Sequence, residues 1–245
     1  MELLPVPSIP TAESPYGLWL PEGRPPKGGA WQLPGYREGL FELQDEGSQL
    51  VALATEALPG DTVLDYCAGR GGKTWILAHL VAPSGRVVAW DVCPDLRLQL
   101  AGGRLSRAGE GLVEVRVPCE ADVVLVDAPC SSSGVLRRHP SQRWALDLLE
   151  VTRLAKLQLQ ILREAAEMVR EGGRLVYATC SLIEMENEGV AREFEATSDF
   201  QPWPFPNGRR GGSHRSPTVT EPCEIVSCIL YTAISDHYRH RTLIR

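Results

Sequence analysis

The amino-acid sequence predicts an α/β fold in which a mostly parallel, twisted sheet carries helices on both faces. The first observation behind this prediction is that strand-like and helix-like runs alternate through the middle of the chain. The second is a glycine-rich turn, residues 67–72, which follows the first strand-like run and precedes a helix-like one. In sheets of this kind ligands bind at the carboxyl ends of the strands, so those ends are where functional residues are expected.

Five apolar runs rich in β-branched residues are predicted to be strands. In chain order they are residues 63–64, 86–90, 112–117, 122–127 and 174–178. Four helices are expected from apolar residues at helical spacing, over residues 45–58, 75–81, 95–107 and 145–170. The last of these has Leu154, Leu157, Ile161, Ala165 and Met168 on one face, and the sequence Glu-Gly-Gly is expected to end it.

The two ends of the chain differ from this middle part. Residues 1–38 are rich in Pro and Gly and are interpreted as an extended lead-in rather than a core, so residues 39–200 form the main domain. Residues 201–245 are an atypical C-terminal segment in which the apolar run from Glu224 can supply one strand, and the last strands of the sheet are uncertain.

Composition favours a cytoplasmic protein that does not enter a membrane. No run of about 18 apolar residues is present, and the N-terminus lacks the basic-then-apolar order of a signal peptide. The seven cysteines are an odd number scattered through apolar runs, which is typical of a reducing compartment rather than of a disulfide framework. A net charge of −6 argues against a strongly basic nucleic-acid-binding protein.

The glycine-rich turn ends in Lys73-Thr74 and invites comparison with two phosphate-binding loops. A P-loop needs glycine five positions before its lysine, where this chain has Ala68. The dinucleotide pattern G-x-G-x-x-G also fails, because the glycines stand at positions 69, 71 and 72. An NTPase therefore remains only as a weak alternative.

Polar residues stand where the predicted strands end. Asp91 follows the second strand at a distance from the glycine turn that suits a carboxylate accepting hydrogen bonds from a ribose. A helix N-cap or a turn aspartate is the alternative, but position and spacing together favour the ribose role. Asp127 ends the fourth strand, and Cys180 follows the fifth.

Three motifs at these strand ends resemble those of the RNA cytosine-5 methyltransferases of the Nop/Sun (Fmu-like) family. They are "DYCAGRGGKT" at 65–74, "DAPCSSSG" at 127–134 and "ATCS" at 178–181. The resemblance extends from about Gly39 to Glu195 and includes Gln158 and the Glu-Asn-Glu sequence at 186–188. It implies a Rossmann-like class I methyltransferase fold, S-adenosyl-L-methionine as cofactor, and methylation of a cytosine in ribosomal or transfer RNA by residues 39–200.

The resemblance also implies roles for individual residues. Cys180 matches the thiol that adds to C6 of the cytosine, and Cys130 matches the thiol that assists release of the methylated RNA. Asp127 matches the carboxylate at the N3 edge of the base, and Lys73 matches a lysine at the rim, where its charge can lower a thiol pKa. The residues expected to hold the cofactor are Cys67, Ala68, Gly69, Arg70, Gly71, Gly72, Lys73, Asp91 and Asp127.

The chain departs from the family pattern in three places. Arg70 replaces the usual proline of the glycine loop. The family's acidic residue against the adenine has only three stand-ins in a shortened stretch, which are Glu114, Glu120 and Asp122. No family pattern is found beyond about residue 212, and we hypothesise that the reading frame changes near residue 213.

The expected partner is RNA, but the acidic net charge leaves a second interpretation open. Basic stretches at 137–143, 208–215 and 237–245 can meet RNA phosphate, among them Arg137, Arg138 and Arg143. The alternative is a catalytically weak or inactive methyltransferase-like RNA-binding protein. A DNA cytosine-5 enzyme is disfavoured, because the Cys180 strand end and Asp127 both match the RNA enzymes.

Overall fold

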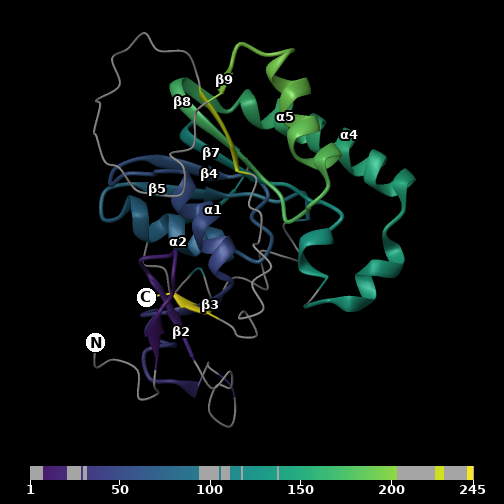
Figure 1. Ribbon diagram of the computed structural model, residues 1–245. Coiled ribbons are helices and arrows are strands. Elements are labelled where there is room, and N and C mark those ends of the chain that lie inside the picture. Colours follow the sequence, from purple (N-terminus) through teal and green to yellow (C-terminus); the bar gives the residue numbers. More distant parts are fainter. Residues whose placement is uncertain are drawn as a thin grey trace.

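A computed structural model describes residues 8–20, 29, 32–93, 105, 111–116, 118–136, 138–202, 224–228 and 242–244. Figure 1 shows a main sheet at the centre of the molecule with helices on either side, and a second, smaller sheet below it. Among the described helices, none is both long enough and apolar enough to cross a bilayer.

The main sheet has seven strands in the order β6-β5-β4-β7-β8-β10-β9, and every neighbouring pair is parallel. The predicted α/β fold with a parallel sheet is therefore confirmed. Five of the strands are those predicted from sequence, and the other two come from the C-terminal part. The bounds are β4 Thr62–Asp65, β5 Arg86–Ala89, β6 Val113–Val115, β7 Ala121–Asp127, β8 Val169–Ala178, β9 Gln201–Pro202 and β10 Glu224–Cys228.

Alternation along the strands divides the core into two layers, as the period of two in a strand requires. In β4, Val63 packs with helices α1 (Glu46–Ala54) and α2 (Gly72–Val81), while its neighbour Leu64 packs on the other face with α4 (Leu148–Ala166) and α5 (Glu188–Glu195). Figure 1 shows the two helix pairs on opposite sides of the strands. Both strand residues are fully buried, which explains why these strands are apolar throughout rather than alternating.

Several helix predictions need correction. The helix expected over 45–58 ends at Ala54, and the one expected over 145–170 begins at Leu148 and ends at Ala166. Residues Pro140–Ala145 form a 3₁₀ helix, and the Glu-Gly-Gly sequence lies inside β8. The short helix α5 was not predicted at all. The helix expected over 95–107 lies outside the described residues, apart from Leu105, which is buried.

The smaller sheet joins the two ends of the chain in the order β1-β2-β11-β3, with antiparallel pairs throughout. Its strands are β1 Ile9–Pro10, β2 Gly17–Trp19, β3 Glu42–Gln44 and β11 Thr242–Ile244. A small apolar cluster of Leu20, Leu33 and Phe41 lies beside it. The segment expected to be an extended lead-in therefore contributes strands and buried side chains.

Candidate active site

Residues singled out by sequence meet, together with Asp65, at one edge of the main sheet. Asp65 and Asp127 are the last residues of β4 and β7, and Cys180 follows the end of β8. Because these strands are parallel and adjacent, their carboxyl ends open onto the same edge. The structure therefore brings these residues together at the edge where ligands are expected, and their binding roles stay a prediction.

The glycine loop between β4 and α2 is held by its neighbours on both sides. The amide of Tyr66 donates to the carbonyl of Leu125 (2.9 Å), and the amide of Ala68 donates to the carbonyl of Trp90 (2.9 Å). Gly69 and Gly71 have φ angles of 55° and 73°, in the left-handed region that glycine adopts without strain. The glycines therefore let the chain turn tightly from the strand into α2.

The Lys-Thr pair at the end of the loop turns towards carboxylates. The Thr74 hydroxyl donates to Asp65 (2.6 Å), and the Lys73 ammonium donates to Asp127 (2.5 Å). In a P-loop the same residue types meet phosphate and Mg²⁺. The contacts made here give no support to the NTPase alternative.

Asp65 was not singled out by sequence, yet it is the most unusual carboxyl group of the site. It is 1 % exposed, and its Oδ1 has no hydrogen-bond partner among the described residues. Burial raises its pKa to about 7, while the hydrogen bond from Thr74 and the charge of Lys73 act in the opposite direction. A buried carboxyl oxygen without a donor is expensive, so this group is poised to accept a cationic or hydrogen-bonding partner.

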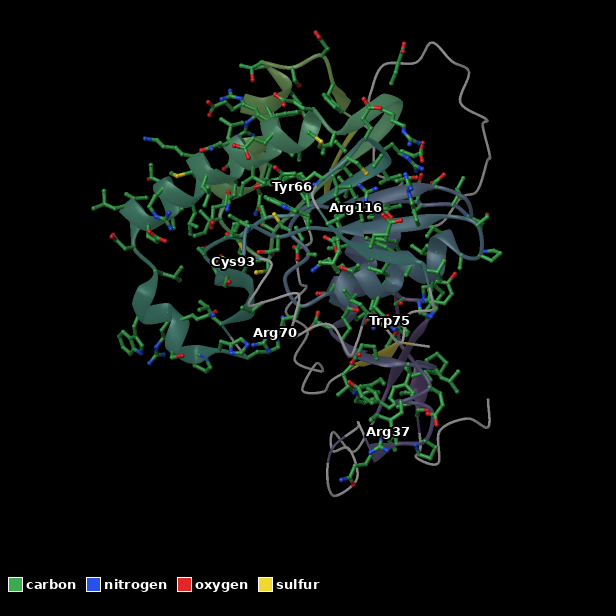
Figure 2. All side chains as sticks on the ribbon, turned by 180° about the vertical axis from the view of Figure 1, so that it is seen from behind. Arg37, Tyr66, Arg70, Trp75, Cys93 and Arg116 are labelled. Carbon is green, nitrogen blue, oxygen red and sulfur yellow. The ribbon has the colours of Figure 1, made fainter. Side chains whose placement is uncertain are left out.

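Asp91 connects the glycine loop to the end of β5. Its two carboxylate oxygens accept hydrogen bonds from the amides of Gly69 (2.9 Å) and Cys93 (3.0 Å), and the side chain is buried. Figure 2 marks Arg70 and Cys93 on the loops at this edge, whereas Arg37 lies beside the smaller sheet. Asp91 therefore stabilises the two turns through its side chain, and a contact with a ribose would be additional to this role.

The two cysteines of the predicted site are in direct contact. The sulfurs of Cys130 and Cys180 are 3.2 Å apart, and the Ser132 hydroxyl lies 3.6 Å from the Cys180 sulfur. The hydrogen bond with Cys130 lowers the pKa of Cys180 from 9.0 to about 7, against the opposing effect of burial. The same hydrogen bond, followed by burial, raises the pKa of Cys130. Of the two thiols, Cys180 is therefore the one that ionises first, as the pH rises through neutrality, while Cys130 keeps its proton.

Lys73 contributes less to the thiolate than the sequence suggests. Burial acts to lower the pKa of Lys73, but the charge and hydrogen bond of Asp127 outweigh it, and the net pKa is raised. Lys73 does lower the pKa of Cys180, yet its effect ranks behind the hydrogen bonds from Cys130 and Ser132. The ammonium group therefore stays charged, and its strongest interaction is with Asp127.

A cavity of about 240 Å³ adjoins Cys130 on the side of α4. Its walls come from the loop that carries Cys130 and from the start of α4, including Ser132, Gln142 and Glu150. The neighbouring Trp144 is 79 % exposed, and the Arg143 guanidinium lies 4.3 Å from the centre of its ring. An exposed aromatic side chain next to a cation is a common platform for a nucleobase.

The remaining basic residues fall into two groups. Arg138 forms an ion pair with Asp45 (2.8 Å), so its charge is partly balanced. Arg137 and the basic stretch at 208–215 lie outside the described residues, as do all of 237–245 except 242–244.

The three residues that could replace the family's acidic residue beside the adenine lie in different places. Asp122 accepts a hydrogen bond from the amide of Thr62 (2.7 Å) and pairs with Arg170 (2.8 Å), which places it at the amino ends of the strands. Glu120 immediately precedes β7 and lies at that same end. Only Glu114, within β6, remains close to the site edge, and its carboxylate pairs with Arg116 (2.5 Å).

Comparison with known proteins agrees with this geometry. Residues 52–206 match the family model "16S rRNA methyltransferase RsmB/F". Ribosomal RNA small subunit methyltransferase B of Thermus thermophilus is 41 % identical over 183 residues, which are 70 % of this chain and 45 % of that protein. The Vibrio cholerae protein of the same name is 38 % identical over 181 residues, or 69 % and 41 % of the two chains. The chain thus spans less than half the length of these curated relatives.

Two solved structures from Pyrococcus horikoshii have the same fold. A methyltransferase homologue superimposes with a TM-score of 0.62 at 31 % identity, covering 72 % of this chain and 57 % of the other. NSun6, solved with SFG, gives a TM-score of 0.60 at 29 % identity, covering 68 % and 45 %. The class I methyltransferase fold predicted from sequence is confirmed by these likenesses.

Proposed function

The chain belongs to the RsmB/F family of 16S rRNA methyltransferases, and we propose from this membership that it methylates C5 of a cytosine in RNA with S-adenosyl-L-methionine. The observation that carries the proposal is the contact between two thiols of opposite protonation, Cys130 and Cys180, beside the Lys73–Asp127 ion pair. A nucleophilic thiolate with a proton donor at hydrogen-bond distance is what a reversible covalent addition to a pyrimidine requires.

The residues at the strand ends fit S-adenosyl-L-methionine. The orphaned oxygen of Asp65 suits a cationic group, and the glycine loop fixed by Asp91 lets a ligand approach the backbone closely. Gly69, Gly71 and Asp91 are the residues proposed to hold it, with Lys73 and Asp127 at the reacting end. When bound, this cofactor supplies a methyl group made electrophilic by its sulfonium charge. The SFG complex of NSun6 supports the assignment.

Cys180 is proposed as the nucleophile. Its thiolate forms a bond to C6 of the cytosine, and the electron pair of the C5–C6 double bond becomes available at C5. Asp127 is proposed to hydrogen-bond the N3 edge of the ring, where protonation makes C6 more electrophilic. The Lys73 ammonium fixes the orientation of this carboxylate through the ion pair.

Cys130 is proposed to act when the methylated base leaves. A base takes the proton from C5, the electron pair of that C–H bond restores the double bond, and the S–C6 bond breaks to return the Cys180 thiolate. A Cys130 thiol 3.2 Å away donates a hydrogen bond to the sulfur as its negative charge reappears. Without that donor the leaving thiolate is less stable, so the covalent adduct should last longer.

RNA is the proposed substrate because the Thermus thermophilus and Vibrio cholerae relatives, at 41 % and 38 % identity, carry ribosomal RNA in their names. The exposed Trp144 and the adjacent Arg143 offer a contact surface for it next to the Cys130 cavity. With a net charge of −6, affinity is expected to depend on such local contacts rather than on the overall field of the protein.

Incubation with total RNA and tritiated S-adenosyl-L-methionine tests the proposal. Wild-type protein should place label in 5-methylcytosine, Cys180→Ala should place none, and Cys130→Ala should accumulate a protein–RNA adduct. Cys119→Ala is the matched control, because Cys119 precedes β7 at the opposite end of that strand from Asp127. Cofactor binding without label in any RNA would favour the alternative of an inactive RNA-binding protein.

A further inference from the structure

The two site cysteines sit on loops that leave neighbouring strands. We define the Cys130 loop as residues 128–136, after β7, and the Cys180 loop as residues 179–183, after β8. Within the described part of the chain, one backbone hydrogen bond joins the loops beyond the strand ends, from the amide of Gly134 to the carbonyl of Cys180 (2.9 Å). A Cβ placed on Gly134 would lie 2.6 Å from that carbonyl oxygen, so the loops touch closely here.

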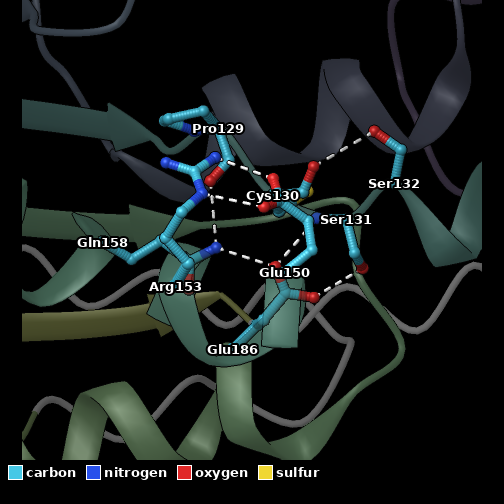
Figure 3. A network of polar contacts seen from close by, with 8 residues as sticks. All are labelled: Pro129, Cys130, Ser131, Ser132, Glu150, Arg153, Gln158 and Glu186. Carbon is cyan, nitrogen blue, oxygen red and sulfur yellow. Dashed lines mark hydrogen bonds and ion pairs between the residues drawn. The ribbon is translucent and has the colours of Figure 1, made fainter. Parts of the chain in front are cut away.

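A buried carboxylate lies beneath both loops. Glu186 is fully buried and accepts hydrogen bonds from the Ser131 amide (2.8 Å), the Ser131 hydroxyl (2.5 Å) and the Ser181 hydroxyl (2.6 Å). Ser131 directly follows Cys130, and Ser181 directly follows Cys180. One side chain therefore holds the residue next to each reactive thiol, and Figure 3 shows Glu186 under the Cys130 loop.

Gln158 of α4 extends this connection to the other side of Cys130. Its side-chain amide is buried and donates to the Pro129 carbonyl (2.9 Å) and to Glu186 (3.0 Å). The Tyr177 hydroxyl of β8 lies within hydrogen-bond distance of the Glu186 backbone carbonyl oxygen (2.6 Å) and of the Gln158 side-chain Oε1 (3.2 Å). Glu186 is therefore anchored to α4 through Gln158 and to the sheet through Tyr177.

We propose that Glu186 is a positioning residue that holds the Cys130 loop against the Cys180 loop, and so keeps the two sulfurs in contact. Buried hydrogen-bonded carboxylates also occur simply to stabilise a fold. This one differs because three of its four side-chain hydrogen bonds come from the residues adjoining the two cysteines. Moving either loop would separate the sulfurs while leaving the sheet intact.

The consequence is measurable without RNA or cofactor. Cys180 is a thiolate near neutral pH mainly because Cys130 donates a hydrogen bond to it. If the loops separate, that hydrogen bond is lost and alkylation of Cys180 should move to higher pH. Although the inference deepens the proposed role of the two cysteines, its test does not depend on methyl transfer.

The experiment is alkylation with iodoacetamide across pH 6–10, followed by mass spectrometry of the Cys180 peptide, with the exposed Cys93 as internal reference. For Glu186→Leu we expect the midpoint for Cys180 to rise by about one pH unit or more. The rate at pH 7 should fall roughly two- to eightfold for a rise of one to two pH units, since the smaller thiolate fraction is partly offset by higher nucleophilicity. Glu186→Gln retains an amide that bonds both hydroxyls and should restore most of the wild-type profile.

Two further variants keep the test informative if Glu186→Leu does not fold. Ser131→Ala removes one donor to Glu186, and Gly134→Ala wedges the loops apart at the Cys180 carbonyl. Both should raise the midpoint for Cys180. Glu46→Leu is the matched control: Glu46 is also buried and accepts the amides of Glu13 (2.8 Å) and Ser14 (2.9 Å), far along the chain from either cysteine.

The two outcomes are distinct. A raised Cys180 midpoint in the loop variants, with an unchanged midpoint in Glu46→Leu, supports the positioning role. An unchanged midpoint in folded Glu186→Leu, or in Ser131→Ala and Gly134→Ala together, overturns it and leaves Glu186 as a stabilising residue of the fold.

Discussion

The sulfur of Cys180 lies 3.2 Å from the sulfur of Cys130, although 50 residues separate them in the chain. Parallel pairing of β7 with β8 brings the two loops together, and the buried Glu186 joins the residues that follow each cysteine. The two thiols differ in acidity, because their contact lowers the pKa of Cys180 and raises that of Cys130.

Replacing Cys130 by alanine should make Cys180 a weaker acid. The hydrogen bond from Cys130 is the largest cause of the lowered Cys180 pKa, so its loss should move that pKa from about 7 towards 9.0. The ultraviolet absorbance of the thiolate, followed against pH, measures the change. Cys119→Ala, a change just before β7 at the opposite end of that strand from Asp127, should leave the titration step near pH 7 unaltered. A Cys130→Ala protein that still titrates near pH 7 would assign the shift to Ser132 and Lys73 instead.

Replacing Lys73 by methionine should reduce both methyl transfer and stability. The substitution removes the partner of Asp127 and a charge that lowers the pKa of Asp65, leaving the carboxylates of the strand ends unbalanced. Transfer is expected to fall by on the order of 10²-fold, as for other disrupted acid–base groups. The free energy of unfolding should fall by about 1–3 kcal/mol. Lys156→Met, on the exposed face of α4, is the control.

A double-mutant cycle that combines Lys73→Met with Asp127→Asn measures how much of each loss comes from the interaction between these two side chains. If the two side chains act together, the losses in the double variant should be smaller than the sum of the single losses. Strict additivity would contradict a functional role for the ion pair.

The sequence predicted the strands of the sheet better than it predicted the contacts between the side chains of the candidate site. Alternating apolar runs predicted five strands, because fully buried parallel strands leave a strong pattern. Helix α5 was missed, since its apolar positions (Val190, Ala191 and Phe194) span only two turns. The strand ends put Cys130 and Cys180 on one edge, but their contact distance is set by tertiary hydrogen bonds that no local pattern encodes.

Asp65 is a second residue whose properties could not be predicted from the sequence. As the polar end of a strand it resembles many turn aspartates in sequence. Its unpartnered oxygen and its raised pKa both come from burial in the folded protein, and the hydrogen bond from Thr74 acts against the raised pKa. The roles of the other cofactor-loop residues remain predictions.

Asp65 should make the protein less stable as the pH rises. Its folded pKa, about 7, is above the ordinary value of 3.8, so the folded state holds this proton more tightly. The stability gained from the protonated form is complete below about pH 4 and is lost as the pH rises through 7. Denaturant unfolding at pH 5 and pH 8 should show the wild type weaker at pH 8 by a few kcal/mol.

Asp65→Asn should remove most of this dependence, because an asparagine does not titrate and its carbonyl can still accept the Thr74 hydrogen bond. Asp199→Asn, an exposed aspartate change, should leave the difference between the two pH values as it is in the wild type. Equal pH dependence in wild type and Asp65→Asn would show that another group is responsible.

Arg143 should strengthen RNA binding through one local charge. Its guanidinium lies over the exposed Trp144 ring, beside the Cys130 cavity. Arg143→Ala should weaken RNA binding several-fold and lower the salt dependence of affinity by about one counterion, as expected when one phosphate contact is lost. Arg170→Ala is the control, because Arg170 pairs with Asp122 at the opposite edge of the sheet. Binding titrations at three salt concentrations measure both quantities. An equal salt dependence of affinity for wild type and Arg143→Ala would show that Arg143 contacts no RNA phosphate. The surface around Trp144 could then contact only a base.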